Sequence, residues 1–447
     1  MTQTTSRGIN RADVPGEIPA LSPSHFSRNW RWNFIWVALS GALFQFGAAF
    51  ADTGTVVAVF VGRLTPSAFA VGAAESIARY GWLLPQLFVA NYAQGLRYRK
   101  PIYLVGGWGR ASFLALLAGV LLIAPIAGGK DGALGRDAAF PLLVVFFVLW
   151  TAFSFISGLA GVPYNDIVGR VIPSNRRSRL LAVRFSVGGV LAVGAGFFVR
   201  VTLQGNNSLA PYGIIFGVGA VMLALSTGCF ALVREPPSPV VRERSGFSAF
   251  LRQGWRVLRG DTRFLLFLYA QLLAGLTAMA IPFYVVQARR VSGLAEAEVG
   301  TLLAAQTLGG LLLNPLWGWW GDRRGKLSLL KALAVTGLVS PLLGLMVPGM
   351  AGPRWALAGY MATFFFLGAV AGGQIIGGLS YLMEISPDDR RPEYSGYMNA
   401  LVAPTRLLPL LAAGLADAVG FGPVFAAAVV AGVLRLGMLQ MLEATSE

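Results

Sequence analysis

Charged side chains are scarce in this sequence of 447 residues. They account for 13% of the chain, about half the share found in soluble domains, whereas 55% of the residues are apolar. A surface in contact with water cannot be built from so few charges, and the mean hydropathy of +0.63 agrees. The composition therefore predicts an all-α membrane protein surrounded largely by the lipid bilayer.

Cysteine and histidine are each present once. Cys229 lies in an apolar segment, so we expect neither a disulfide framework nor a thiolate metal site. His25 lies in the polar N-terminal tail, so histidine chemistry inside the membrane is excluded. The sequence also lacks a phosphate-binding Gly-rich loop followed by Lys and Ser/Thr, and it lacks a nucleophile with a histidine partner. We therefore expect no enzymatic activity and no cofactor.

Long apolar runs are abundant instead. Scanning for stretches of about 20 apolar residues indicates twelve spans, and an even number places both termini on one side. The first 30 residues lack the hydrophobic core of a cleaved signal peptide, so we expect the first span to direct insertion. The predicted spans cover residues 34–61, 70–92, 103–127, 139–167, 180–202, 211–233, 263–286, 298–320, 329–349, 355–384, 394–418 and 422–442.

Lysine and arginine are divided unequally between two sets of loops. The N-terminal tail and alternate loops hold 25 of them, the opposite loops hold seven, and four lie within spans. By the positive-inside rule the richer set is cytoplasmic, so both termini face the cytoplasm from the cell (inner) membrane. Because the basic residues form short clusters between apolar runs, we interpret the net charge of +16 as a topology signal and expect no nucleic acid partner.

The longest connection divides the spans six and six. After three prolines, apolar residues at helical spacing oppose Arg252, Arg256 and Arg259, which predicts an amphipathic helix on the anionic inner leaflet. A basic linker without a partner and a regulatory element are both open interpretations. The predicted organisation is a polar tail at 1–32, a six-helix bundle at 33–233, the linker at 234–262, a second bundle at 263–442 and a short tail at 443–447.

The two halves share a short motif. VIPSNRRSR at 171–179 matches EISPDDRRPE at 384–393, and the pair at 176–177 corresponds to the pair at 390–391 with an offset of 214 residues. A duplicated six-span unit is typical of transporters whose substrate site lies near the membrane midplane.

The stretch LWGWWGDRRGK, at 316–326, ends the eighth span. Together with the twelve spans, the basic central loop and the repeat, it resembles the major facilitator superfamily, whose loop between the second and third helices of each half reads approximately Gly-x-x-x-Asp-Arg-x-Gly-Arg-Lys. The resemblance implies two pseudo-symmetric bundles of six transmembrane helices that work by alternating access. In the first-half copy, at 91–101, Gly95 replaces the acid. The residues that fit the motif are Gly318, Asp322, Arg323, Gly325 and Lys326.

We expect the motif acid to act as a latch. A carboxylate beside the start of a helix is stabilised by unpaired N–H groups and the helix dipole, by about 0.3–1 kcal/mol when exposed. The resemblance implies that Asp322 faces the start of the fifth span and that the first-half loop faces the start of the eleventh. The alternative is that these charges are only topology signals in solvated loops. The residues expected opposite the two loops are Arg176, Arg177 and Arg179, and Asp388, Asp389 and Glu393. Arg390 and Arg391, the second copy of the arginine pair, are further gating candidates.

Polar residues within spans are costly and mark candidate sites. Asp52 precedes Gly62 by ten residues and therefore lies about 15 Å from the outer end of the first span, with Gln45 on the same helical face. Burial favours the neutral form of a carboxyl group, which makes Asp52 the candidate for proton coupling; a structural hydrogen bond is the alternative. Glu75 and Arg79, at i and i+4, are expected to form a local pair.

Arg406 lies about 18 Å deep in the eleventh span. An arginine there needs an acceptor, which could be a substrate carboxylate or phosphate, or an internal partner such as Asp52 or Asp417. Gln271 and Gln374 belong to helices that line the central cavity in the resembled superfamily. We expect them either to contact substrate or to join helices by hydrogen bonds.

These features predict a secondary transporter, expected to be a monomer, that moves a small solute by rocking its two halves around a midplane cavity. The alternative is a non-transporting membrane protein of the same fold that serves in assembly or sensing. The direction of transport stays open, because Arg406 favours an organic anion and the apolar spans favour efflux. The fifth span lacks the Gly-Pro signature of proton-coupled drug antiporters, which weakens efflux by that route.

Cysteine labelling tests the predicted orientation. In a Cys229→Ala background, single cysteines placed at 128–138 should react with an impermeant maleimide added to intact cells, because that loop is expected outside. Cysteines placed beside Arg242 should react only after permeabilisation and serve as the control. Labelling of the 128–138 loop only from inside would mean that the topology is inverted.

Overall fold

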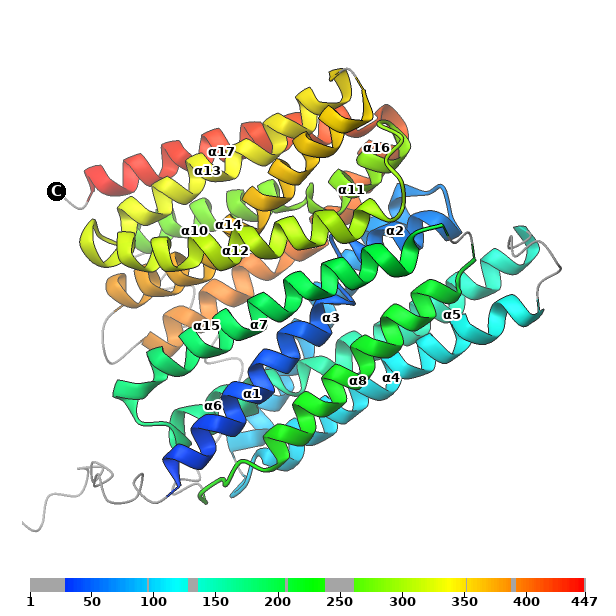
Figure 1. Cartoon of the computed structure of the whole chain (residues 1–447). Helices are drawn as coiled ribbons and strands as arrows, with labels where there is room; N and C mark the ends of the chain where they lie inside the picture. Colours follow the sequence, from blue (N-terminus) through cyan, green and yellow to red (C-terminus); the bar gives the residue numbers. More distant parts are fainter. Residues whose placement is uncertain are drawn as a thin grey trace, which may run out of the picture.

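The structure, a computed structural model, describes residues 29–94, 96–127, 136–205, 208–237, 261–350, 352–386 and 391–445. Within these ranges the chain consists of helices joined by turns and short loops (Figure 1). The predicted amphipathic helix, His25, Gly95 and Arg390 lie outside them. The helices before the linker are α1 (Trp30–Ala49), α2 (Val56–Leu64), α3 (Ala68–Gln94), α4 (Lys100–Ala127), α5 (Arg136–Gly158), α6 (Gly161–Val171), α7 (Ser174–Leu203) and α8 (Ala210–Ala231).

The second half begins at Asp261, whose side chain caps its first helix by accepting a hydrogen bond from the N–H of Phe264. Its helices are α10 (Thr262–Ala278), α11 (Ile281–Arg290), α12 (Glu298–Arg323), α13 (Lys326–Met346), η2 (Val347–Gly349), α14 (Pro353–Ile385), α15 (Arg391–Val402), η3 (Ala403–Leu407), α16 (Leu408–Val419) and α17 (Phe421–Ala444).

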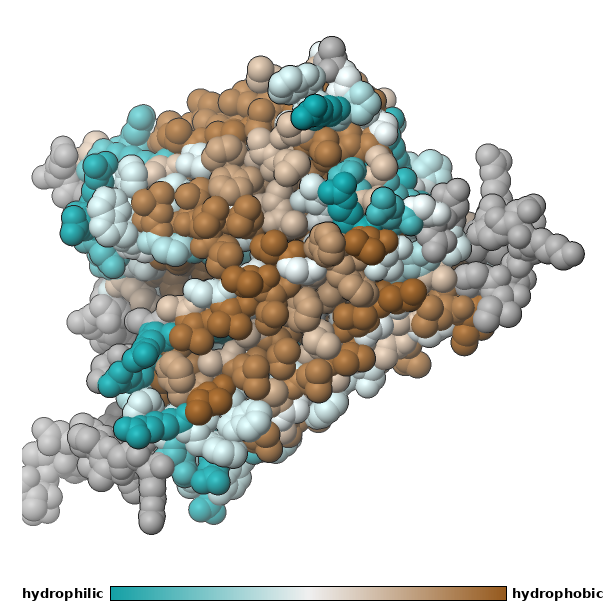
Figure 2. Space-filling view, viewed as in Figure 1, coloured by the Kyte–Doolittle hydropathy of each residue, from teal (hydrophilic) through white to brown (hydrophobic). Residues whose placement is uncertain are grey.

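Apolar side chains cover the middle of the molecule, and hydrophilic residues collect at its two ends (Figure 2). In the described part of the chain, ten helical segments are long and apolar enough to cross a membrane. This confirms the predicted all-α, multi-pass membrane fold. The first two predicted spans correspond to α1 with α2 and to α3, which pack against α7, α8, α5 and α16. The total of twelve spans stays a prediction.

Several predicted spans are interrupted helices. The first span was expected to be continuous over 34–61, but the structure breaks it between α1 and α2 at the sequence Asp52-Thr-Gly-Thr55. Here the Thr55 hydroxyl donates to the Asp52 carboxylate at 2.7 Å, a local bond that competes with helix formation, and Gly54 further weakens the helix. The eleventh span is interrupted by η3, where Pro404 cannot donate a backbone hydrogen bond.

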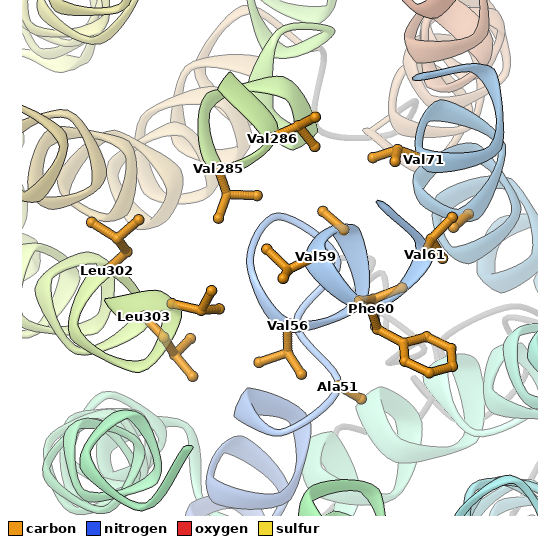
Figure 3. Packing of buried hydrophobic residues seen from close by; sticks show 14 of the residues in the cluster. Ala51, Val56, Val59, Phe60, Val61, Val71, Val285, Val286, Leu302 and Leu303 are labelled. Atoms are coloured by element: carbon orange, nitrogen blue, oxygen red, sulfur yellow. The ribbon is translucent and has the colours of Figure 1, made fainter. Parts of the chain in front are cut away.

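At one end of the molecule the two halves share a single apolar core. Figure 3 shows side chains of α2, among them Val56, Val59 and Phe60, enclosed by residues of α3, α11 and α12, among them Val285 and Leu302. We call this the closed end. It holds the segments that join α2 to α3, α7 to α8, α11 to α12 and α16 to α17 (Figure 1).

At the opposite end each half has its own core. One cluster is built from α1, α4, α6, α7 and α8, and two separate clusters are built from helices of the second half. Within the described ranges, no hydrogen bond or ion pair that crosses between the halves lies at this end. Figure 1 shows the halves separating toward this end, where the C-terminus lies. We call it the open end.

Two close helix crossings hold the closed end together. Gly196 of α7 lies against Gly300 of α12 so closely that a Cβ at position 196 would stand 2.6 Å from the Gly300 carbonyl oxygen. Similarly, a Cβ at Gly72 of α3 would stand 2.9 Å from the Cβ of Ala413 in α16. Small residues permit this approach, which maximises van der Waals contact where lipid supplies no hydrophobic drive.

A wedge at the α7–α12 crossing should open the closed end. In Gly196→Val the new side chain must displace backbone atoms of α12, whereas in the matched control Gly194→Val it meets open space. Spin labels at Gln204 and Arg354, in a Cys229→Ala background, report the distance between the halves. We expect Gly196→Val to add a longer distance component and Gly194→Val to match the parent; identical distributions in all three proteins would contradict the role of this crossing.

Candidate functional site

Asp52 lies in the break between α1 and α2, and the nine residues of α2, about 14 Å long at 1.5 Å per residue, separate this break from the closed end. Its carboxylate is half-buried and accepts the hydrogen bond from Thr55, and its backbone carbonyl accepts from the N–H of Val57 at 3.0 Å. None of the ion pairs formed in the described ranges includes Asp52. The break therefore presents a carboxylate without a cationic partner at mid-depth.

Glu75 and Arg79 of α3 form the predicted i, i+4 pair. The Glu75 side chain is completely buried, and its second carboxylate oxygen has no hydrogen-bond partner in the structure. Both residues act electrostatically on Asp52, which lies in the neighbouring helix break. The pair is therefore part of the surroundings of Asp52 and not an isolated surface feature.

Arg406 reaches the same region from the second half. It lies in η3, makes none of the ion pairs formed in the described ranges, and lines a narrow cavity together with Arg79, Met279 and Thr405. Glu75 and Arg79 act electrostatically on it. We call Asp52, Glu75, Arg79 and Arg406 the four-charge cluster. The cluster is neutral when both carboxylates are ionised. Its residues come from both halves, and two of them, Asp52 and Arg406, lie where a helix is interrupted.

The three glutamines proposed as substrate contacts each touch a neighbouring helix of their own half. Gln45 donates to the Arg184 carbonyl at 3.5 Å, and Gln271 packs against Gly378 of α14. Gln374 accepts a hydrogen bond of 2.9 Å from Arg435, a buried arginine of α17. All three side chains remain partly exposed, and their contact with substrate stays a prediction.

Above the four-charge cluster, polar contacts seal the closed end. Glu296 joins the halves, since its carboxylate pairs with Arg63 at 2.9 Å and with Arg289 at 3.2 Å, and it accepts from the Tyr212 hydroxyl. Asp417 reaches across to the start of α3 and accepts from the N–H groups of Ala68 and Phe69 at 2.8 and 3.1 Å. A carboxylate placed at a helix start is stabilised by the dipole and by otherwise unpaired donors. These contacts therefore favour closure, and Asp417 is not the partner of Arg406.

Comparison with known proteins identifies the fold. The model of the Major Facilitator Superfamily matches residues 287–442. The solved nucleoside transporter NupG superposes with a TM-score of 0.65 at 13% identity, covering 92% of this chain and 99% of that one. A peptide transporter POT gives a TM-score of 0.66 at 14% identity, covering 92% and 94%. Residues 287–442 are thus similar to the Major Facilitator Superfamily, and the chain shares the fold of these two solved transporters.

Relatives by sequence lie in mycobacteria. Uncharacterized proteins of Mycobacterium tuberculosis and Mycobacterium bovis are 25% identical to this chain over 280 residues, which is 61% of this chain and 53% of theirs. The chain thus spans about half the length of the curated relatives it matches. A bacterial homologue of the iron transporter ferroportin, in its inward-facing state, shares the fold with a TM-score of 0.62 at 14% identity, covering 92% and 98%.

The superfamily motif lies at the open end. Gly325 has a φ of +86° and begins α13, so a residue with a side chain would be strained at this turn. Asp322 is 78% exposed and pairs at 2.7 Å with Lys326 of its own loop. The expected partners also stay local: Arg177 donates to the carbonyls of Ile172 and Gly169, and Arg176 stacks on an indole ring of α1. The side chains of Arg391 and Glu393 lie outside the described part.

An acid from a distant part of the sequence lies against the first-half loop, which lacks the acid of the motif. Glu235, just after α8, accepts hydrogen bonds from the N–H groups of Arg99 and Lys100 at 2.8 and 2.9 Å, at the start of α4. Its carboxylate also pairs with Arg170 at 2.6 Å and is 2% exposed. Asp166 of α6 pairs with Arg99 and Arg170. Sequence reasoning missed Glu235 because it treated the residue as part of a basic linker.

Replacement of Asp322 should affect the closing of the open end. Among the described residues its carboxylate bonds only Lys326. Asp322→Asn should therefore leave the present state intact and remove dipole stabilisation from the state in which the open end is closed. Spin labels at Tyr98 and Met383, in a Cys229→Ala background, report the distance across this end. We expect the short-distance population to shrink in Asp322→Asn and to be unchanged in the control Glu443→Gln, an exposed acid of the same half. Equal populations in all proteins would remove the latch hypothesis.

Proposed function

We propose that this protein is a secondary transporter that moves a small solute by alternating access and couples that movement to protons through Asp52. The observation that carries the proposal is the four-charge cluster, which joins both halves at mid-depth, below the closed end. In membrane transporters, irregular backbone at mid-depth is typical of substrate and ion sites, because helix breaks there free polar groups.

The structure has the features of one state of such a cycle. The open end holds the starts of α1, α4 and α7, where basic residues are concentrated, so we propose that it faces the cytoplasm. The fold also matches the ferroportin homologue better in its inward-facing state, at a TM-score of 0.62, than in its outward-facing state, at 0.57. We infer an inward-facing transporter whose halves rock about the α3–α16 and α7–α12 crossings.

Protonation of Asp52 would change the charge balance of the cluster. With both carboxylates ionised, two negative and two positive charges cancel; a proton on Asp52 leaves one excess positive charge. Arg79 and Arg406 line the same narrow cavity from opposite halves, so excess positive charge would disfavour their approach. This supplies a physical route from proton binding to movement between the halves.

The solute itself is proposed only as a small molecule. The similar structures include a nucleoside transporter, a peptide transporter and a bacterial homologue of the iron transporter ferroportin, and a shared fold does not imply a shared substrate. The proposal also includes two six-helix bundles at 33–233 and 263–442 and a monomeric state. We further propose that the protein lies in the inner membrane with both termini in the cytoplasm. The labelling experiment above tests the orientation, and light scattering of the purified protein tests the monomeric state.

Asp52→Asn should abolish coupling while largely sparing solute binding. The amide keeps the shape of the side chain and can accept from Thr55, but it cannot carry a proton between states. A thermal-shift screen of the purified protein supplies a solute, because ligands that favour the folded state raise the Tm. Uptake of that solute into proteoliposomes, with and without an imposed pH gradient, then measures coupling.

We expect the parent to accumulate solute when the gradient is imposed and Asp52→Asn only to equilibrate it. The control is Glu443→Gln, an acid outside the cluster that pairs with Lys331 of its own half and is 49% exposed. It should accumulate solute as the parent does. If Asp52→Asn also accumulates solute against its gradient, Asp52 is not the coupling residue; if no solute binds or moves, the assembly or sensing interpretation becomes the better one.

A further inference from the structure

We propose that Arg110 and Arg184 form a binding subsite for the anionic group of the solute, a carboxylate or a phosphate, within the first half. The inference names a solute class and therefore rests on the proposed transport function. It concerns residues apart from the four-charge cluster. Its basis is two arginines that the fold brings close to one phenylalanine ring and that form no ion pair within the described residues.

Arg110, on α4, is 5% exposed. Its Nε and Nη2 atoms are buried and have no hydrogen-bond partner. The side chains that act on it electrostatically are those of Tyr103 and Arg184, and neither is a carboxylate. Breaking a buried ion pair is strongly destabilising because it leaves an unpaired charge. An arginine held in this condition is expected to have an anion as its missing partner.

Arg184, on α7, faces the same space. Its Nη1 donates to the Tyr164 hydroxyl at 2.7 Å, and its buried Nε has no partner. The guanidinium carbons of Arg110 and Arg184 lie 4.6 and 6.0 Å from the centroid of the Phe44 ring. Phe44, Tyr164 and Arg184 are partly exposed, whereas Arg110 is buried.

The depth of this site favours a solute over a lipid headgroup. Arg110 and Arg184 each follow the first residue of their helix by ten positions, which places both about 15 Å from the open end. Lipid phosphates lie outside the hydrocarbon core and therefore closer to the open end than these two arginines. Arginine presents paired donors that match the oxygens of carboxylate and phosphate, and the aromatic rings suit an apolar or aromatic body. We therefore expect an organic anion.

Binding of small aromatic anions to the purified full-length protein tests this subsite without any gradient. The probes are benzoate and phenyl phosphate, and benzamide is the neutral control, titrated at constant ionic strength while the Tm is recorded. We expect saturable stabilisation by at least one anion and none by benzamide. The anion with the lower half-saturating concentration identifies the carboxylate or the phosphate class.

The variants Arg110→Gln and Arg184→Gln should each weaken anion binding about tenfold or more, as loss of a charged hydrogen bond implies. Arg263→Gln, which removes an exposed arginine of the second half that donates to the Thr445 carbonyl, should bind as the parent does. Because Arg184 is partly exposed, its variant carries the test if Arg110→Gln fails to fold.

The proposal would be overturned if neither benzoate nor phenyl phosphate stabilised the parent saturably. Unchanged anion binding in Arg184→Gln would also overturn it. If the anions bind but the proteoliposome experiment shows no role for Asp52 in coupling, the subsite is supported and the proposed coupling role is wrong. The two proposals can therefore fail separately.

Discussion

The structure depends on direct contact between two helix pairs at the closed end. Where Gly196 meets Gly300 and Gly72 meets α16, the backbones approach more closely than any side chain would permit. These crossings bring Glu296 and Asp417 within reach of the opposite half, so that the polar seal is a consequence of the glycines. They also leave the open end without such contacts in the described residues, because rigid helices that converge at one end must diverge at the other.

The bilayer places a second constraint on the interior. Free backbone groups at mid-depth must find partners inside the protein, and the breaks around Asp52 and Arg406 meet this demand differently. At Asp52 the turn is closed by its own carbonyl and by the Thr55 hydroxyl. Arg406 lies in a 3-10 segment, Ala403–Leu407, that contains Pro404. At both breaks the backbone is held by local hydrogen bonds, so that no charged side chain from the opposite half is needed to complete them.

The sequence predicted those parts of the molecule that local patterns determine. Hydropathy located the helices, and i, i+4 spacing predicted the Glu75–Arg79 pair. The sequence did not reveal that the first span would break, because four small residues barely interrupt a long apolar run. Contacts between distant parts of the sequence were also hidden: Arg110 is one of the four basic residues within predicted spans, and Arg184 is one of the 25 basic residues counted as a topology signal. Their common space exists only when α1, α4 and α7 pack together.

Glu235, which accepts hydrogen bonds from the start of α4, takes the place of the acid that the first-half loop lacks. In the motif of the second half, charge and turn are encoded in one continuous loop, whereas in the first half the loop contributes the basic residues and the chain after α8 contributes the acid. Position 95 is consequently free to lose its carboxylate without leaving Arg99 and Arg170 uncompensated. The connection between the halves is in turn tied to α4 and α6 by a buried charge, so mechanical tension on that connection is transmitted to the base of the first bundle.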